Sequence, residues 1–132
     1  MSTARIVIAI VVVFILSCAF GTIIHAFLLN NDYQQVAQLY RSAPILHMIF
    51  AGYFGFAVGS VWLYTKGVED KPWLGQGLRF GLAIWLVVSV TSFFIEYATQ
   101  PIPESLFVKQ LGYELVNKLI LGVVTAAILQ KS

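Results

Sequence analysis

Four long apolar runs, separated by shorter polar stretches, dominate the chain. They cover residues 6–29, 45–64, 78–97 and 106–129. About 20 predominantly apolar residues let a helix cross the hydrocarbon core of a bilayer. The pattern therefore predicts an all-α fold, an integral membrane four-helix bundle made of two transmembrane hairpins. All of residues 1–132 are expected to form a single transmembrane domain.

The polar stretches carry signals that end one helix and begin the next. Residues 30–32, Asn-Asn-Asp, indicate a turn after the first run, and Pro44 suits the first turn of the second helix. Within the same loop, helical spacing predicts a short interfacial helix through Val36, Leu39 and Tyr40. Pro72-Trp73 is expected to begin the third helix at the interface, and Pro101 with Pro103 separates it from the fourth.

The composition supports lipid as the main solvent of this chain. Of its residues 59% are hydrophobic and only 11% are charged, with a mean hydropathy of +0.84, whereas a soluble domain carries about 25% charged residues. A cleaved signal peptide is the competing interpretation of the first run, which is longer than the usual apolar core of about 7–15 residues. The net charge of +2, without any basic run, gives no indication of nucleic-acid binding. Cys18 is the only cysteine, which excludes an internal disulfide.

The basic residues predict an orientation. Most of them flank the runs on the side that holds both termini: Arg5, Lys66, Lys71, Arg79 and Lys131. Only Arg41 and Lys109 fall on the other side. Because cytoplasmic loops carry the excess of lysine and arginine, both termini are expected in the cytoplasm.

The fourth run contains polar residues where lipid disfavours them. At 100° per residue, one stripe of this helix collects Gln110, Glu114, Asn117, Lys118 and Thr125. A charge at the centre of a membrane helix costs about 2.5–3.5 kcal/mol on insertion scales. We therefore expect the other helices to cover this stripe.

The other three helices add titratable groups at a similar depth, in the outer half of the membrane. The predicted polar intramembrane cluster consists of His25, His47, Glu96, Glu114, Asn117 and Lys118. Such a cluster is typical of a binding or transport site for a small solute, a proton or a metal ion. The alternative is structural: Glu114 and Lys118 form an i, i+4 ion pair, and the histidines are hydrogen-bonded at the interface.

The sequence requires no cofactor, but two cofactor sites remain open. The metal-ligand candidates are His25, His47, Glu96 and Glu114, a set of imidazoles and carboxylates that suits zinc or iron. Alternatively, His25 and His47 could hold one haem through two axial imidazoles. Neither set has the fixed short spacing of a true motif. No nucleotide-binding or nucleophile motif is present, so nothing indicates an enzyme.

Small residues four apart predict where helices approach closely. Gly55 and Gly59 lie in the second run, and Gly77 and Gly81 at the start of the third. Such pairs let membrane helices pack without a hydrophobic driving force between them. They favour a compact bundle, and also allow a homodimer. Arg79 is expected to anchor the third helix, with its stem along the lipid and its charged head among the headgroup phosphates. The alternative is a specific contact with the phosphate of a substrate or of a lipid.

The segment KGVEDKPWLGQGLRFG, residues 66–81, resembles a group of small four-span bacterial inner-membrane proteins of unknown function. The turn at residues 100–103 and the start of the fourth helix around 109–110 are similar too. The resemblance implies a multi-pass protein of the bacterial inner membrane and supplies no activity or functional residue.

Two functional classes follow from these observations. In the first, the polar cluster binds or moves a small solute, proton or metal ion, and the chain forms a homo-oligomer because four spans rarely enclose a pathway alone. In the second, the protein is a non-catalytic accessory or assembly subunit whose polar stripe contacts a partner membrane subunit. Both classes place the protein in the lipid bilayer.

Overall fold

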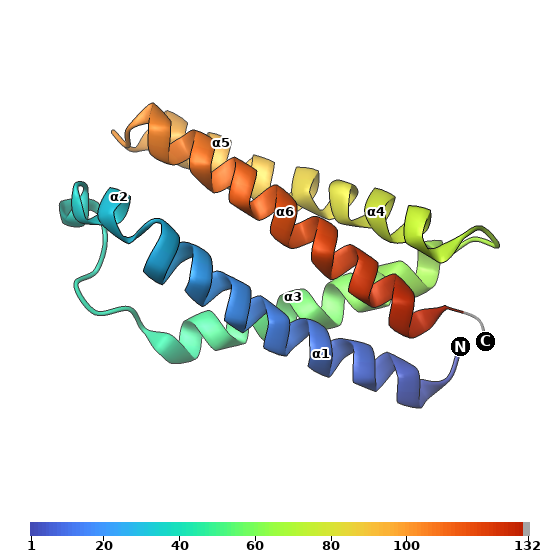
Figure 1. The fold of residues 1–132 in the computed structure, drawn as a ribbon. Helices are drawn as coiled ribbons and strands as arrows, with labels where there is room; N and C mark the ends of the chain where they lie inside the picture. The colour runs from blue at the N-terminus through green and yellow to red at the C-terminus, as the bar shows by residue number, and fades with distance from the viewer. Residues whose placement is uncertain (131–132) are drawn as a thin grey trace.

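The computed structural model describes residues 1–130, and this part of the chain is all-helical (Figure 1). Four of its helices are long and apolar enough to cross a membrane: Thr3–Leu28, Leu46–Gly67, Trp73–Thr99 and Glu104–Leu129. The all-α class is confirmed, and the four candidate spans correspond to the four predicted runs, with ends that differ by a few residues. Lys131 lies outside the described residues.

Two of the four spans are not α-helical throughout. The first consists of α1 (Thr3–Gly21) and a π-helical end, η1 (Thr22–Leu28), and the third of α4 (Trp73–Ile84), the π-helical η3 (Trp85–Val90) and α5 (Thr91–Thr99). The second and fourth spans are the single helices α3 (Leu46–Gly67) and α6 (Glu104–Leu129). A π-helix holds more residues per turn than an α-helix, so each π segment rotates the face that follows it.

The residues at the helix boundaries show which of the local start signals coincide with the first residue of a helix. Ser2 caps α1, because its hydroxyl accepts a hydrogen bond from the Arg5 N–H at 3.2 Å. Pro72 immediately precedes Trp73, the first residue of α4, as predicted. Pro44 does not enter α3, which begins two residues later at Leu46. That prediction was wrong, since Ile45 is still extended.

The first loop is more helical than expected. The short helix α2 (Asn30–Gln34) occupies the position of the predicted turn, so the turn at residues 30–32 was wrong. A single turn of 3-10 helix, η2 (Ala37–Leu39), takes the place of the predicted interfacial helix. A small apolar cluster beneath this loop attaches it to η1 and to the start of α6: Ile24, Leu29, Val36, Ile102 and Leu106.

Helices α4 and α6 pack closely because glycines line both sides of their contact. A Cβ atom added at Gly77 would lie 2.8 Å from the Cα of Val123, and one added at Gly81 would lie 2.8 Å from the Cα of Leu119. On α6, a Cβ at Gly122 would lie 2.7 Å from the Gly81 nitrogen. The backbones therefore approach to a distance that only glycine allows. The packing predicted for Gly77 and Gly81 is confirmed.

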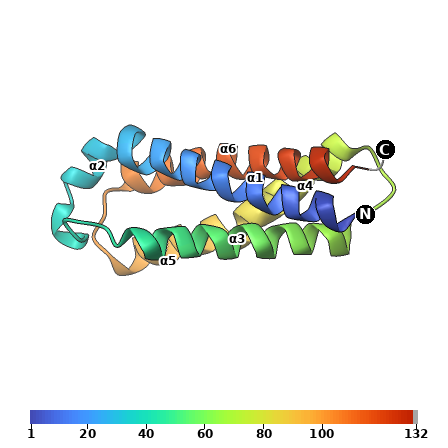
Figure 2. The ribbon, with the colours of Figure 1, turned by 90° about the horizontal axis from the view of Figure 1, so that it is seen from below.

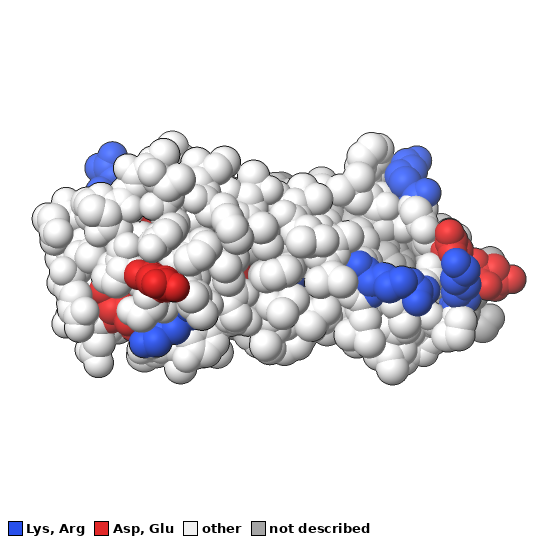
Figure 3. All heavy atoms as spheres, turned by 90° about the horizontal axis from the view of Figure 1, so that it is seen from above, with Lys and Arg blue, Asp and Glu red and all other residues white. Residues whose placement is uncertain are grey.

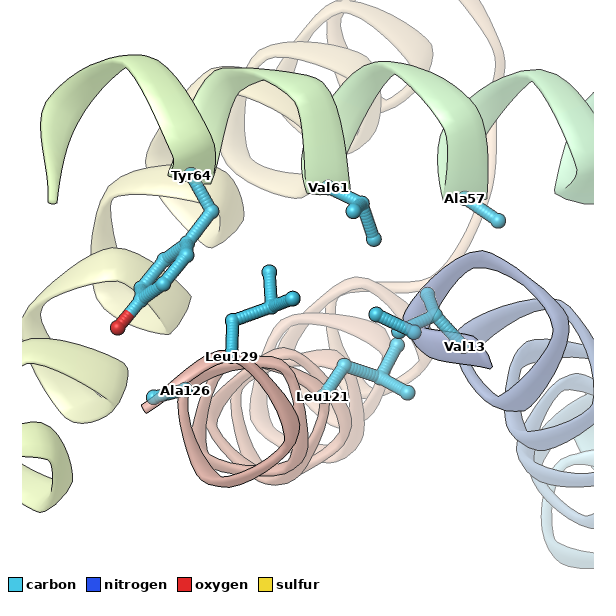
Figure 4. Close-up of a cluster of buried hydrophobic side chains, with 8 residues drawn as sticks. Val13, Ala57, Val61, Tyr64, Leu121, Ala126 and Leu129 are labelled. Carbon is cyan, nitrogen blue, oxygen red and sulfur yellow. The ribbon is translucent and has the colours of Figure 1, made fainter. Parts of the chain in front are cut away.

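A hydrophobic core joins α1, α3 and α6 in the half of the molecule that contains the N-terminus and the end of α6 (Figures 1 and 4). We call this end the terminal end and the opposite end the α2 end. The core consists of Ala9, Val13, Ala57, Val61, Tyr64, Leu121, Ala126 and Leu129. At the terminal end the Arg5 guanidinium also donates to the backbone oxygen of Gln130 at 2.5 Å.

Helix α3 leaves the bundle toward the α2 end. Its beginning lies apart from α5 (Figure 1), and no residue from Leu46 to Phe56 is buried. Gly55 and Gly59 have no other part of the chain within 4 Å of an added Cβ. The packing predicted for them within one chain is therefore not formed, because α3 turns these glycines outward.

Acidic and basic side chains gather toward the two ends of the face seen in Figure 3, and the middle of that face is almost free of them. The four long helices run roughly along the same direction between these ends (Figure 2).

Candidate functional site

The polar stripe of α6 faces inward along its whole length. Gln110, Glu114, Asn117, Lys118 and Thr125 are all buried, in line with the buried Leu121. The other spans thus cover the charges, as expected from their cost in lipid. This part of the sequence prediction is confirmed.

Glu114 is the centre of the site because three donors converge on its carboxylate. Oε2 accepts from the Lys118 ammonium at 2.7 Å and from the Asn117 amide at 3.1 Å. Oε1 lies 3.4 Å from His25 Nε2. Glu114 and Lys118 remain only 5% and 8% exposed. A buried pair of charges persists only with good geometry and further hydrogen bonds, and both conditions hold here.

His25 connects this carboxylate to the first loop. Its Nδ1 lies 2.7 Å from the Tyr33 hydroxyl, and the Gln110 amide donates to the same hydroxyl at 3.1 Å. Since Tyr33 accepts from Gln110, its own proton is free to be donated to Nδ1. The remaining proton of a neutral His25 then lies on Nε2, toward Glu114. The contacts therefore join Gln110, Tyr33, His25 and Glu114 in one series.

The π-helical end of the first span places His25 in this network. The Leu29 N–H donates to the Ile24 oxygen at 2.9 Å, a bond over five residues that closes the π turn around His25. The third span has its own π segment, where the Trp85 indole donates to the Leu111 oxygen of α6 at 3.0 Å. Single π segments recur at functional sites, because they re-aim side chains without breaking the helix.

Sequence reasoning missed Tyr33 and Tyr40, which lie in the first loop. Burial raises the pKa of Tyr33 to about 12, with the hydrogen bond from Gln110 acting in the opposite direction. Burial, and then the hydrogen bond to Glu96, raise the pKa of Tyr40 well above its usual value. The only available signal was two tyrosines in a loop next to a span containing histidine, and that signal fixes no contact.

Glu96 does not join the cluster around Glu114. It accepts a hydrogen bond from the Tyr40 hydroxyl at 2.5 Å. The Tyr40 ring meets the Tyr33 ring edge to face, with centroids 5.3 Å apart. Glu96 therefore borders the network through two tyrosines and makes no direct contact with its carboxylate.

His47 lies outside the site, exposed at the start of α3, where that helix leaves the bundle. Within residues 1–130 no three His, Cys, Asp or Glu side chains come together as a metal site. The metal set of His25, His47, Glu96 and Glu114 is therefore not assembled in this part of the chain. His47 is exposed on α3, and Glu96 on α5 is bonded to Tyr40.

A cavity of about 320 Å³ opens beside the charged pair, between α1, α3, η3 and α6. Its polar wall is formed by Ser17, Asn117 and Lys118. The Lys118 ammonium also lies 5.1 Å from the centre of the Phe56 ring. Its lining also includes the exposed apolar side chains of Met48 and Ile49, so the cavity opens at an apolar part of the surface.

Two polar atoms in this wall are buried without a partner. They are the Ser17 hydroxyl and the Asn117 Oδ1, which make no hydrogen bond within the described residues. Gln110 Oε1, near Tyr33, is the third such atom. Buried polar groups are paired in most folded proteins, because each unpaired group costs about 1–3 kcal/mol.

Comparison of the chain with protein-family models, with curated proteins and with solved structures gives no match. The resemblance of residues 66–81 to small four-span membrane proteins thus stays a prediction. Function has to be argued from the site itself.

Proposed function

We propose that the protein binds a small solute inside the membrane, in the cavity between α1, α3, η3 and α6, with Lys118 as the polar anchor. One observation carries this proposal: Ser17, Asn117 and Lys118 line the cavity together, and the first two hold buried polar atoms that have no hydrogen-bond partner within the described residues. A ligand that supplied their missing hydrogen bonds would remove the cost of burying them.

The wall defines the chemistry of the solute. Lys118 has N–H groups beyond the one that it gives to Glu114, and Ser17 can donate as well. Asn117 Oδ1, in contrast, can only accept. The polar end of the solute must therefore carry at least one acceptor and one donor, as a carboxylic acid or a hydroxy ketone does. Its remaining part is apolar, because it passes Met48 and Ile49 at the mouth.

The polar network connects the site to the first loop. Tyr33 lies 2.7 Å from His25, and His25 lies 3.4 Å from Glu114. A protonated solute in the cavity would contact Lys118 or Asn117, and both of these side chains already donate hydrogen bonds to Oε2 of Glu114. Binding is therefore coupled to the charge on Glu114 in this proposal.

The location follows from the charges at the two ends. At the α2 end, Lys109 pairs with Asp32 at 3.1 Å, which leaves Arg41 as the unpaired cation of that end in residues 1–130. Arg5, Lys66, Lys71 and Arg79 lie at the terminal end. By the positive-inside rule this asymmetry favours both termini in the cytoplasm, and we propose the bacterial inner membrane as the host bilayer.

The direct test is native mass spectrometry of the untagged protein, gently solubilised from its own membrane. We expect a reproducible extra mass on the wild-type chain and its loss from a Ser17→Ala variant. The Ser17 hydroxyl has no partner in the fold, so its removal leaves stability unchanged or slightly higher. Loss of the extra mass without loss of stability therefore reports binding. An identical mass on both proteins, or none on the wild type, contradicts the proposal.

A second function is favoured by the outward glycines of α3. Gly52, Gly55 and Gly59 have open space around them, and small residues on an exposed membrane helix suit contact with another helix. The occupant would be a second copy of the chain or a helix of a larger complex, in which this protein is an accessory subunit. A Gly55→Cys variant in a Cys18→Ala background tests this in intact membranes. Oxidation to a dimer of this chain supports the homodimer, and cross-linking to another polypeptide supports the accessory role.

A further inference from the structure

A second cavity, of about 300 Å³, lies at the terminal end of the molecule. It is bounded by the end of α3, the loop 68–72 and the start of α4. Its polar lining comes from Glu69, Lys71, Gln76 and Arg79, and its apolar lining includes Leu63 and Phe80. It is separate from the cavity beside Lys118. Apart from Leu63 and Tyr64, its lining belongs to the segment 66–81, which takes no part in the proposed binding site.

Gln76 gives this cavity a defined shape. Its side-chain oxygen accepts from the Glu69 N–H at 2.7 Å, and its amide nitrogen donates to the Glu69 and Lys71 oxygens, both at 2.8 Å. One side chain thus satisfies three backbone groups of the loop and fixes it against α4. The conformation of the loop therefore depends on Gln76, which is itself a residue of the cavity wall.

Of the charged side chains that line the cavity, one cation has no ion-pair partner within residues 1–130. Glu69 and Lys71 form an ion pair, and this hydrogen bond lowers the pKa of the Glu69 carboxyl. Arg79 makes no ion pair or hydrogen bond within residues 1–130. The guanidinium presents five N–H donors in a planar fork that matches the oxygens of a phosphate group.

We propose that this cavity binds the phosphate group of an anionic phospholipid, with Arg79 as the principal contact and Lys71 as the second. The position favours a lipid over a soluble phosphate. Trp62 and Trp73 lie on either side of the loop, as interfacial aromatic residues do at the level of the headgroups. Leu63 is 50% exposed beside the cavity and provides an apolar path for an acyl chain.

The test measures thermal stabilisation of the purified full-length protein in a neutral detergent by three probes. Dioleoyl phosphatidylglycerol carries both phosphate and acyl chains, inorganic phosphate carries only the phosphate, and dioleoylglycerol carries only the acyl chains. We expect stabilisation by phosphatidylglycerol alone. Stabilisation by inorganic phosphate as well, at similar concentration, would assign the site to a free phosphate and overturn the lipid as its source. An equal effect of dioleoylglycerol would overturn the phosphate site altogether.

Variants separate a built site from general attraction to an anionic surface. Arg79→Gln should weaken the phosphatidylglycerol effect roughly tenfold, because it removes a charge-assisted pair of hydrogen bonds. Lys66→Gln is the matched control: it removes the same charge at the same end, but Lys66 lies over the Trp62 ring, outside the cavity. Equal losses in the two variants contradict the proposal.

Two further variants keep the test decisive if Arg79→Gln is poorly folded. Arg79→Lys retains the charge but loses the planar fork, and we expect it to weaken phosphatidylglycerol binding as well. Gln76→Ala leaves every charge in place and releases the loop, so the same loss is expected from it. Full binding by both variants would show that neither the fork nor the loop matters, and would overturn the site.

Discussion

The hydroxyl of Tyr33 lies 2.7 Å from Nδ1 of His25, and this contact connects a loop at the surface to a carboxylate inside the bundle. On its other side His25 faces Glu114 at 3.4 Å. Gln110 donates to the same Tyr33 hydroxyl at 3.1 Å, so this hydroxyl joins α6 to the first loop as well as to His25. The loop is thereby part of the site.

Replacing Tyr33 by Phe should destabilise the protein although the ring remains. The change leaves the Gln110 amide and His25 Nδ1 without their partner in a largely buried position. Each unpaired buried group costs about 1–3 kcal/mol. Thermal unfolding in detergent should show the loss. Tyr113→Phe is the control, because Tyr113 is exposed on the same helix as Gln110 and should tolerate the change; equal unfolding temperatures for wild type and Tyr33→Phe would contradict the network.

Alkaline pH should act on the same tyrosine. Burial raises the pKa of Tyr33 from 10.0 to about 12. A raised pKa means that the folded state holds the proton more tightly, so the contribution of Tyr33 to stability is complete below pH 10 and is lost as the pH rises toward 12. Tyrosinate absorbance in the ultraviolet, recorded for wild type minus Tyr33→Phe, should show one group titrating near pH 12. A difference spectrum that titrates near pH 10 would show that Tyr33 is solvated.

The spans and the buried stripe could be predicted from the sequence because both depend on local periodicity. The length of an apolar run sets a span, and the 100° step places Glu114 and Lys118 on one face of α6. The Glu114–Lys118 contact follows directly from this spacing, and the structure contains it at 2.7 Å. Periodicity within one helix is information that a single sequence carries.

The contacts between helices could not be predicted, because they depend on how the helices tilt. Comparing depths along the chain placed His47 beside His25, on the assumption of parallel helices. In the structure α3 leaves the bundle at that end, and His47 is exposed. The same tilt separates two glycine pairs of identical spacing: Gly77 and Gly81 meet α6, whereas Gly55 meets nothing.

The π segments were a second source of error. On an uninterrupted α-helix, Ser89, Ser92 and Glu96 would share one face of the third span. In the structure Ser89 is buried within η3, whereas Ser92, just beyond it, is exposed. A π segment adds residues to a turn and so rotates the following face. The apolar pattern of residues 85–90 gives no signal that the helix changes from α to π geometry there.

The two glycine pairs supply a matched prediction about packing. Gly81→Ala should destabilise the protein by about 1–3 kcal/mol, because its Cβ would meet the backbone of Lys118 and Leu119 and force α4 away from α6. Gly59→Ala should be neutral or slightly stabilising, since nothing lies within 4 Å and alanine favours the helix. Thermal unfolding of the two variants in the same detergent checks the difference. Loss of stability in Gly59→Ala alone would place the close helix contact at α3 and thus favour a partner helix there.

Glu114 and Lys118 should show strong coupling in a double-mutant cycle. Glu114→Gln leaves the Lys118 ammonium buried without its anion, and breaking one side of a buried pair costs about 3–5 kcal/mol. Lys118→Met is expected to cost less, because His25 and Asn117 still donate to the carboxylate. The double variant Glu114→Gln/Lys118→Met removes both charges and should recover much of the stability lost by Glu114→Gln, as measured by unfolding in detergent and by abundance in the membrane.

The recovered fold of this double variant should nevertheless lose the bound solute of the proposed site, because the polar anchor is gone. Full solute binding by the stable double variant would separate the ion pair from the function and leave it a purely structural role; additive losses in the cycle would show that the two charges do not interact.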